Sequence, residues 1–199
     1  MALDLTPTCR TGTSTGLAHW QRQCGFTAVE LMVVVGIAAV LTTLAGPSFA
    51  QIIESWRVRS VQESLQSSLM LARSEAIKRG GRVAIQKIPN NTNGCTGAAE
   101  NAAWNCGWLV CHDVNDNGRC DAGEAVLQRM ESNGKVEVTR SVSNASIKLN
   151  RWGLVDGAWP GFSLVPLNKS IAHPGARGVC MSSGGRIQVL LPEAIPCRD

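Results

Sequence analysis

A segment near the middle of the chain carries oxygen-bearing side chains at regular spacing. It fits the pattern Asp-x-Asn-x-Asn-Gly-x5-Glu with Asp113, Asn115, Asn117 and Glu124, and Asp121 adds a further carboxylate. Calcium takes about six to eight hard oxygen ligands, so the segment is a candidate Ca²⁺ loop. A hairpin turn is the alternative, because Asn, Asp and Gly hydrogen-bond and cap their own turns. The flanking residues alternate as strands do, so we favour the turn and expect no cofactor.

Cysteine is the second residue type that could do chemistry. Six of the eight cysteines lie beyond the apolar N-terminal part of the chain: Cys95, Cys106, Cys111, Cys120, Cys180 and Cys197. An even number favours disulfides if this part folds in an oxidising compartment. A zinc site that uses His112 with its neighbouring cysteines is the competing hypothesis, but the spacing matches no paired C-x-x-C ligand pattern. Six cysteines allow about 15 pairings, which the residues alone leave open.

No pattern in the sequence indicates an enzyme. His112-Asp113 and Ser182-Ser183 lack the flanking glycines of a nucleophile elbow, and there is no phosphate-binding Walker loop. The formal net charge of +4 is too mild to indicate a nucleic-acid-binding protein by itself. The sequence therefore predicts a non-catalytic protein.

An apolar run with one carboxylate near its start occupies the N-terminal part of the chain. No charged residue occurs from Leu31 to Ile53, about 23 residues, which is enough to cross a bilayer as a helix. Glu30 precedes this run, and a charge in lipid needs a partner. A plain signal anchor leaves Glu30 unpaired, and a secretory signal cut after Ala50 would have an unusually long apolar region. Neither alternative explains the carboxylate.

The stretch that begins Gly25-Phe26-Thr27-Ala28-Val29-Glu30 resembles the signal of type IV pilins and pseudopilins. The resemblance implies that a prepilin peptidase cuts after Gly25, that Phe26 is methylated, and that Glu30 pairs with a neighbouring subunit during assembly. It also implies a single-pass inner-membrane protein with its globular domain in the periplasm. The expected partners are other major and minor pilins or pseudopilins.

Beyond the apolar run, the spacing of hydrophobic residues predicts that the helix continues. Steps of three and four residues follow one helix face, and Gly80-Gly81 supplies a stop. Gly46-Pro47 should bend or locally open the helix, because proline removes a backbone donor. We therefore expect a leader over 1–25 and a helix over 26–80, transmembrane in its first half and amphipathic in its second.

From residue 81 to the end, the hydrophobic period changes to two. Short alternating runs predict eight strands, which contain the following pairs: Val83/Ile85, Trp108/Val110, Val126/Met130, Val136/Val138, Ile147/Leu149, Phe162/Leu164, Val179/Met181 and Ile187/Val189. Runs of this length suit an antiparallel sheet or sandwich. The sequence thus predicts an α+β fold, with the helix packed on a globular β domain over 81–199.

This order of elements resembles the GspH/FimT class of minor pilins and pseudopilins. Within that class, Gly185-Arg186 resembles the DNA-binding Gly-Arg-x-Arg segment, with Gln188 in place of the second arginine. Arg177 and Arg198 could compensate, but we favour ordinary solvated arginines over a DNA site.

Among the cysteine pairings we favour the local set, Cys95–Cys106, Cys111–Cys120 and Cys180–Cys197. The last has support from the C-terminal pairs of the class that the chain resembles. The resemblance implies a minor type IV pilin that initiates or caps pilus assembly. A pseudopilin of a type II secretion system, or a DNA receptor for natural transformation, would be the alternative.

Overall fold

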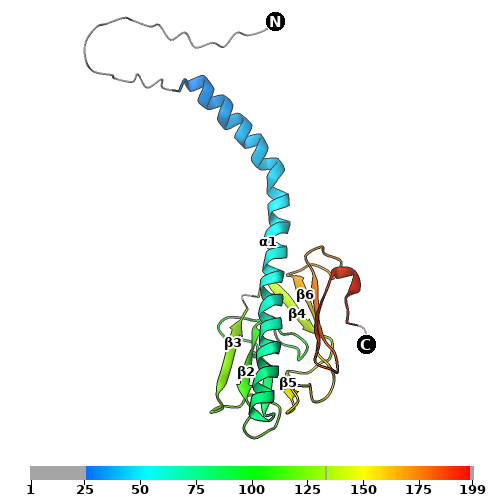
Figure 1. Cartoon of the computed structure of the whole chain (residues 1–199). Coiled ribbons are helices and arrows are strands. Elements are labelled where there is room, and N and C mark those ends of the chain that lie inside the picture. Colours follow the sequence, from blue (N-terminus) through cyan, green and yellow to red (C-terminus); the bar gives the residue numbers. More distant parts are fainter. Residues whose placement is uncertain (1–25, 133, 198–199) are drawn as a thin grey trace, which may run out of the picture. The chain divides into compact units, whose positions relative to one another are not determined.

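The computed structural model describes residues 26–132 and 134–197, and for residues 43–48 it describes the backbone only. The chain divides into two compact units between Leu44 and Ala45. Within the described residues, one long helix precedes eight strands and a short 3₁₀ helix, and Figure 1 shows their arrangement. The elements are α1 (Ala28–Arg79), β1 (Val83–Lys87), β2 (Gly107–His112), β3 (Val126–Glu131), β4 (Val136–Arg140), β5 (Ser146–Leu149), β6 (Gly161–Pro166), β7 (Arg177–Met181), β8 (Ile187–Leu190) and η1 (Pro192–Ala194).

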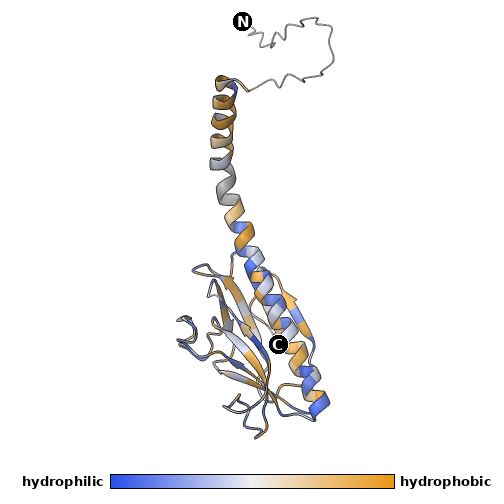
Figure 2. Cartoon of the chain, turned by 90° about the vertical axis from the view of Figure 1, so that its left-hand side faces the viewer, coloured by the Kyte–Doolittle hydropathy of each residue, from blue (hydrophilic) through white to orange (hydrophobic). Residues whose placement is uncertain are grey.

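The helix α1 contains two kinds of surface along one backbone. Every described side chain between residues 28 and 42 is exposed, and Figure 2 shows this part as almost uniformly hydrophobic. From Ala45 on, a stripe at helical spacing is buried: Val58, Leu65, Leu69, Ala72 and Ala76. This stripe contains the positions that the sequence pattern predicts for the inner face, apart from Val61, which is partly buried against the same core.

The two ends of α1 follow from local sequence. At the C-terminal end, Gly80 has a φ of 71°, and the Gly81 amide donates to the Ala76 carbonyl at 2.7 Å. This is a Schellman arrangement, which needs glycine in the left-handed position. The predicted stop is therefore confirmed. The predicted opening at Pro47 is not found, because α1 continues through it as one helix.

No helix within the described residues is both long enough and apolar enough to cross a bilayer. The predicted membrane-spanning half includes residues 43–48, whose side chains lie outside the described residues. That part of the prediction stays a prediction.

The eight predicted strands all form, and they pair in two antiparallel sheets. The strand orders are β3-β2-β1-β5 and β4-β6-β7-β8. The part of α1 from Ala45 on lies across these strands (Figure 1), and one hydrophobic core joins its buried stripe to both sheets. The α+β class is as predicted, and of the two predicted arrangements, one sheet or a sandwich, the strands form two sheets.

Tryptophan side chains connect the helix and the two sheets. The Trp108 indole N–H donates to the Ser68 hydroxyl of α1 at 2.9 Å, so its only polar group is satisfied within the core. The Trp104 ring meets Phe162 of the second sheet edge to face, with ring centroids 5.2 Å apart. Both tryptophans are therefore core residues rather than exposed stacking surfaces.

Two buried cations hold loops in place by binding backbone carbonyls. Lys87 Nζ donates to the carbonyls of Ala98, Glu100 and Ala103, at 2.7, 2.5 and 3.2 Å. Burial lowers the pKa of Lys87, while the nearby charge of Glu100 partly opposes that shift. Arg140 likewise donates to carbonyls, and burial lowers its pKa to about 10. The Lys87 contacts fix the connection between β1 and β2, and the Arg140 contacts fix the connection between β4 and β5.

Candidate functional site

The start of α1 places a carboxylate next to an exposed apolar surface. The Thr27 hydroxyl accepts a hydrogen bond from the Glu30 amide at 3.2 Å, which caps the first turn. Glu30 is exposed, and no described residue forms an ion pair with it. A first-turn carboxylate is favoured by the helix dipole and remains free to bind a cation. Gly25, the predicted cleavage position, lies outside the described residues, and Phe26 is exposed.

The capping role of Thr27 was not part of the sequence prediction. Its signal was present, because a threonine three residues before a glutamate has the form of a capping box. The local sequence therefore explains why the helix begins at Ala28 rather than at Phe26.

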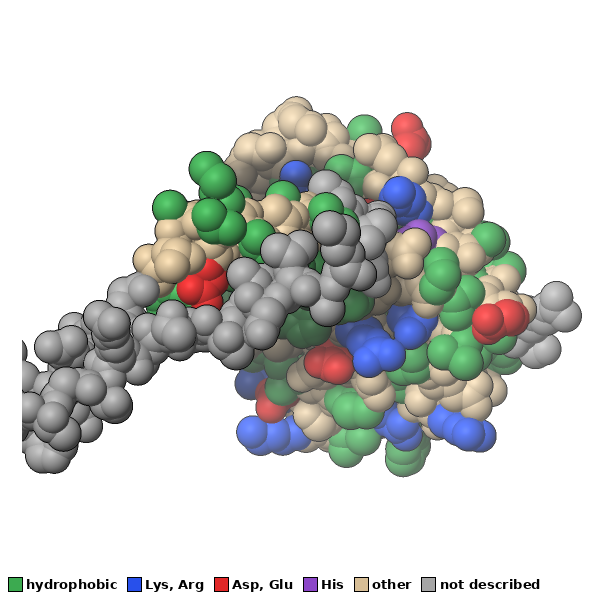
Figure 3. All heavy atoms as spheres, turned by 90° about the horizontal axis from the view of Figure 1, so that it is seen from above, with side chains coloured by type: hydrophobic (Ala, Val, Ile, Leu, Met, Phe, Trp, Pro, Cys, Tyr) green, Lys and Arg blue, Asp and Glu red, His purple; other side chains and the backbone are tan. Residues whose placement is uncertain are grey.

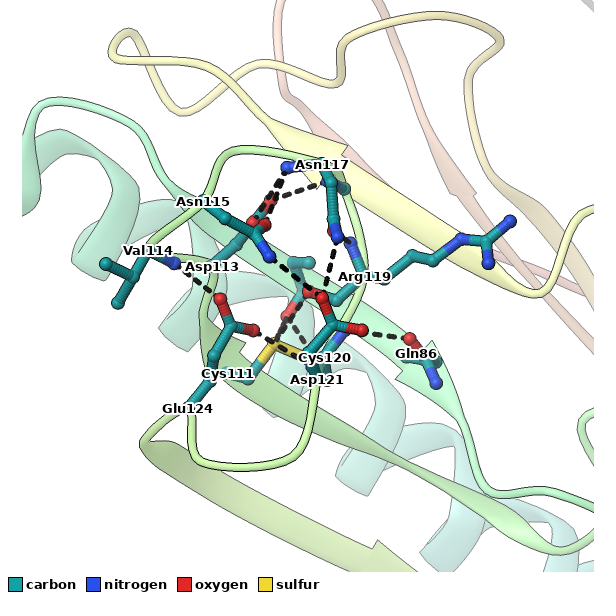
Figure 4. Close-up of a disulfide and its surroundings, with 12 residues drawn as sticks. Gln86, Cys111, Asp113, Val114, Asn115, Asn117, Arg119, Cys120, Asp121 and Glu124 are labelled. Carbon is teal, nitrogen blue, oxygen red and sulfur yellow. Dashed lines mark hydrogen bonds between the residues drawn. A yellow bond between two sulfur atoms is a disulfide. The ribbon is translucent and has the colours of Figure 1, made fainter.

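The candidate calcium loop connects β2 to β3, and its first carboxylate is buried. Asp113 accepts hydrogen bonds from the amides of Asn117 and Gly118, at 3.0 and 2.7 Å. Both of its oxygens are therefore bound to backbone donors within the same loop (Figure 4). The side chain acts as the internal cap of a turn, as the alternative prediction had it.

The other carboxylates of this loop are also bound to N–H groups. One oxygen of Asp121 accepts from the side-chain amides of Asn115 and Asn117, at 2.9 and 2.7 Å. These two hydrogen bonds lower the pKa of the Asp121 carboxyl. Glu124 accepts from the amides of Val114 and Asp121, at 2.7 and 2.9 Å. The asparagines thus donate to the carboxylates instead of presenting their oxygens to a common centre.

A disulfide closes the same loop. Cys111 of β2 bonds to Cys120, and the Cys120 amide donates to Gln86 Oε1 of β1 at 2.8 Å (Figure 4). Among the described residues, no group of three or more His, Cys, Asp or Glu side chains could hold a metal ion. The arrangement found here is a cross-linked hairpin loop anchored to the sheet.

The other two disulfides also follow the favoured local pairing. Cys95 bonds to Cys106 in the connection between β1 and β2, and Cys180 of β7 bonds to Cys197 near the C-terminus. All six cysteines of the globular unit are therefore joined in pairs close in sequence.

The two candidate DNA-binding arginines that the structure describes lie near opposite ends of β7. Arg186 follows the turn after β7 and is exposed, whereas Arg177 begins β7 and donates to the Pro174 and Ala176 carbonyls. The five-residue length of β7 separates the two arginines, which corresponds to roughly 16 Å along the strand. Arg198 lies outside the described residues. Figure 3 shows a face on which the basic side chains are interspersed with hydrophobic and acidic ones.

Arg73 of α1 lies near Arg186, and the sequence alone did not identify it as a candidate site residue. Its guanidinium donates to the carbonyls of Gly184 and Gly185 in the turn before β8. Gly185 has a φ of 76°, and a Cβ there would lie 2.7 Å from the Arg73 guanidinium carbon. The turn therefore requires glycine, and it brings two arginines together at one end of β8.

Comparison with protein families gives a match over most of the globular unit. The profile of the family described as "Type II transport protein GspH" matches residues 62–185. The chain belongs to the GspH family. The matched range begins in α1 and ends just before β8, so it includes the helix–sheet core and seven of the eight strands.

Solved structures resemble this GspH-family chain in fold. Two crystal structures of the type IV minor pilin FimU from Pseudomonas aeruginosa match at 18% and 19% sequence identity, with TM-scores of 0.50 and 0.49. Each covers 68% of this chain, and the matches span 90% and 94% of the FimU chains. No curated protein matches the chain. The first structural match shows the shared α+β fold, and the family match makes this a pilin-like protein.

Proposed function

We propose that this chain is a minor type IV pilin, a non-catalytic subunit that helps to initiate or cap pilus assembly. A prepilin peptidase would cut it after Gly25, and Phe26 would then be the methylated N-terminus. Before assembly, the first half of α1 would hold the protein in the inner membrane as a single span, with the globular unit in the periplasm.

The observation that carries this proposal is the contrast between the two halves of α1. The first half presents exposed apolar side chains on every side, while the second half buries its apolar stripe within its own unit. Apolar surface of that extent needs a cover of lipid or of other apolar helices. Glu30 adds a charge that has no partner among the described residues and that would be costly in lipid. An N-terminal amine of a neighbouring subunit would neutralise it.

A pseudopilin of a type II secretion system is the second candidate. The family description favours it, since it names type II transport. The same helix and the same carboxylate would serve in either machine, because each would pack apolar helices side by side. The two candidates differ in the filament that takes up the subunit.

The test is Glu30→Ala in the full-length protein, produced in its own host. We expect a variant that is cleaved, membrane-held and folded, with its three disulfides formed, but absent from purified filaments. Loss of surface pili would support the pilin, and loss of secreted enzymes with normal pili would support the pseudopilin.

Glu63→Ala is the matched control. Glu63 is an exposed glutamate on the second half of the same helix. It should assemble as the wild type does. Normal assembly of Glu30→Ala would overturn the proposed role of this carboxylate.

A further inference from the structure

The two sheets have four edge strands, and three of them are covered by chain or carry charges. Ala103 bridges to Thr139 of β4, and Val155 bridges to Leu149 of β5. The open edge strand β3 carries an ion pair between Arg129 and Glu131, at 2.8 Å. Charges on an edge strand oppose pairing with another chain. These three edges are therefore protected against pairing with another chain, two by a bridging segment and one by its charges.

The fourth edge, β8, has neither kind of protection. Its sequence, Ile187-Gln188-Val189-Leu190, contains no charge, and Figure 1 shows this red strand at the margin of its sheet. Val189 is 40% exposed, and Leu191, which follows the strand, is 59% exposed. An open, uncharged and apolar edge is a template for a further strand.

The hydrogen-bonding groups of this edge point outward. The Ser182 amide donates to the Arg186 carbonyl at 2.9 Å, so the backbone carbonyl of Arg186 points toward the β7 side of the pair. Orientation alternates along an antiparallel pair, so the backbone N–H and C=O groups of Ile187 and Val189 face away from β7. No described residue forms a hydrogen bond with them. The described chain after β8 is linked back to β7 by the Cys180–Cys197 disulfide and forms no backbone hydrogen bond with Ile187 or Val189.

A groove lies beside this edge, between α1 and the turn before β8. It has a volume of about 350 Å³ and is lined by Met70, Arg73, Ser74, Ile77, Gly185, Arg186 and Ile187. Met70 and Ile77 are 51% and 54% exposed, although they lie on the half of α1 that packs on the sheets. A strand added to β8 would direct alternate side chains toward this apolar surface.

One end of the groove is positively charged. Arg73 and Arg186 both line it, and no acidic side chain among the described residues forms an ion pair with either. Arg73 is held by backbone carbonyls, so its charge is not neutralised. A ligand that carries a carboxylate at this end would gain charge-assisted contacts.

We propose that β8 and the adjoining groove bind an extended segment of another protein by strand addition. The segment has apolar side chains at alternate positions and a carboxylate that meets Arg73 and Arg186. Backbone hydrogen bonds to Ile187 and Val189 supply much of the affinity, and the groove selects the side chains. The inference rests on the proposed function in one respect, since it identifies the surface through which such a subunit contacts a different subunit.

A second copy of this chain is a poorer occupant. Antiparallel pairing of two β8 edges follows a two-fold axis perpendicular to the sheet, which would make the two α1 helices run in opposite directions. Subunits held in one membrane by the same helix have the same direction. The geometry therefore favours a segment of a different protein.

The test uses the full-length protein with the photoreactive residue benzoylphenylalanine in place of Val189, in cells that assemble it. Leu191 is a second probe position, in case the first variant does not fold. Val126 of β3 is the matched control, since it is also a valine on an open edge and is 54% exposed. Crosslinked peptides are identified by mass spectrometry, and thiol labelling checks that the three disulfides form.

We expect the probe at 189 or 191 to crosslink to one segment of another protein. That segment should alternate apolar and polar residues and carry Asp or Glu at one end, and the probe at 126 should not capture it. Arg186→Glu should reduce the crosslink yield about fivefold, the factor expected for loss of one exposed ion pair. Arg151→Glu, the same charge change at another exposed arginine, should leave the yield unchanged.

Four results would overturn the inference: no crosslink from either probe, crosslinks only to lipid or to a second copy, the same segment captured from position 126, or a yield insensitive to Arg186→Glu. The crosslink forms wherever the two proteins meet, in the membrane or in a filament. A failure of the pilin proposal would appear instead as a chain that is never taken up by filaments, even if it still gives the crosslink.

Discussion

The two halves of α1 have the same helical backbone, but they differ in whether their apolar side chains are buried. Between residues 28 and 42 every described side chain is exposed, and most are apolar. Between Val58 and Ala76 one stripe of apolar residues is buried: Val58, Leu65, Leu69, Ala72 and Ala76. The second half therefore completes its packing within the chain, whereas the first half needs a cover that the chain does not supply. This difference indicates that α1 packs against its own sheets in its second half, and we propose lipid or other apolar helices as the cover of its first half.

The largest effect should come from a truncation in the buried stripe. Leu69→Ala removes a fully buried side chain and leaves a cavity, which should lower the free energy of unfolding by about 2–5 kcal/mol. Urea titration of the full-length protein in detergent measures this, with the buried Trp104 and Trp108 as fluorescent reporters.

Leu41→Ala is the control for Leu69→Ala. Leu41 lies on the first half of α1 and is exposed. Its truncation should change the unfolding free energy by less than about 0.5 kcal/mol. If the two variants lost equal free energy of unfolding, the two halves would not differ in their packing.

A smaller effect should come from the disulfide that closes the β2–β3 loop. Replacing both Cys111 and Cys120 with serine removes a link between residues nine positions apart. The chain-entropy relation predicts a loss of about 2–3 kcal/mol in the globular unit. Amide exchange between residues 28 and 42 should not change, because every described side chain in that part of α1 is exposed. Faster exchange there would show that the disulfide stabilises both units.

The smallest effect should be confined to the first turn of α1. Thr27→Ala removes the hydroxyl that caps the Glu30 amide, which should weaken that turn by about 1 kcal/mol. Hydrogen exchange of the Glu30 and Leu31 amides measures the fraying. Thr42→Ala is the control, because the Thr42 hydroxyl donates to the Ala39 carbonyl within the helix and caps nothing. A shift of the urea midpoint of the globular unit in Thr27→Ala would mean that the two halves unfold together.

Local patterns in the sequence predicted the elements, because local physics determines them. Each of the eight strands was predicted from hydrophobic residues at every second position. The end of α1 was predicted from Gly80-Gly81. The favoured disulfides join cysteines between 9 and 17 positions apart, so short connections sufficed to pair them.

Contacts between distant residues could not be predicted in this way. The division of the strands into two sheets depends on β5 returning to pair with β1, which no local pattern encodes. The contact between Arg73 and the Gly184-Gly185 turn joins residues more than 100 positions apart. The calcium pattern has the same limit, since the sequence does not say whether carboxylates turn toward a common centre or, as Asp113 does, toward backbone amides.

The central claim is that the apolar half of α1 belongs to a processed, pilin-like subunit. The most direct measurement is mass spectrometry of the N-terminus of the protein isolated from membranes of its own host. We predict a mature chain that begins with methylated Phe26, and a full-length chain when Gly25 is replaced by a bulky residue. A mature N-terminus at Gln51, the product of an ordinary secretory cleavage after Ala50, would remove the apolar helix and contradict the account.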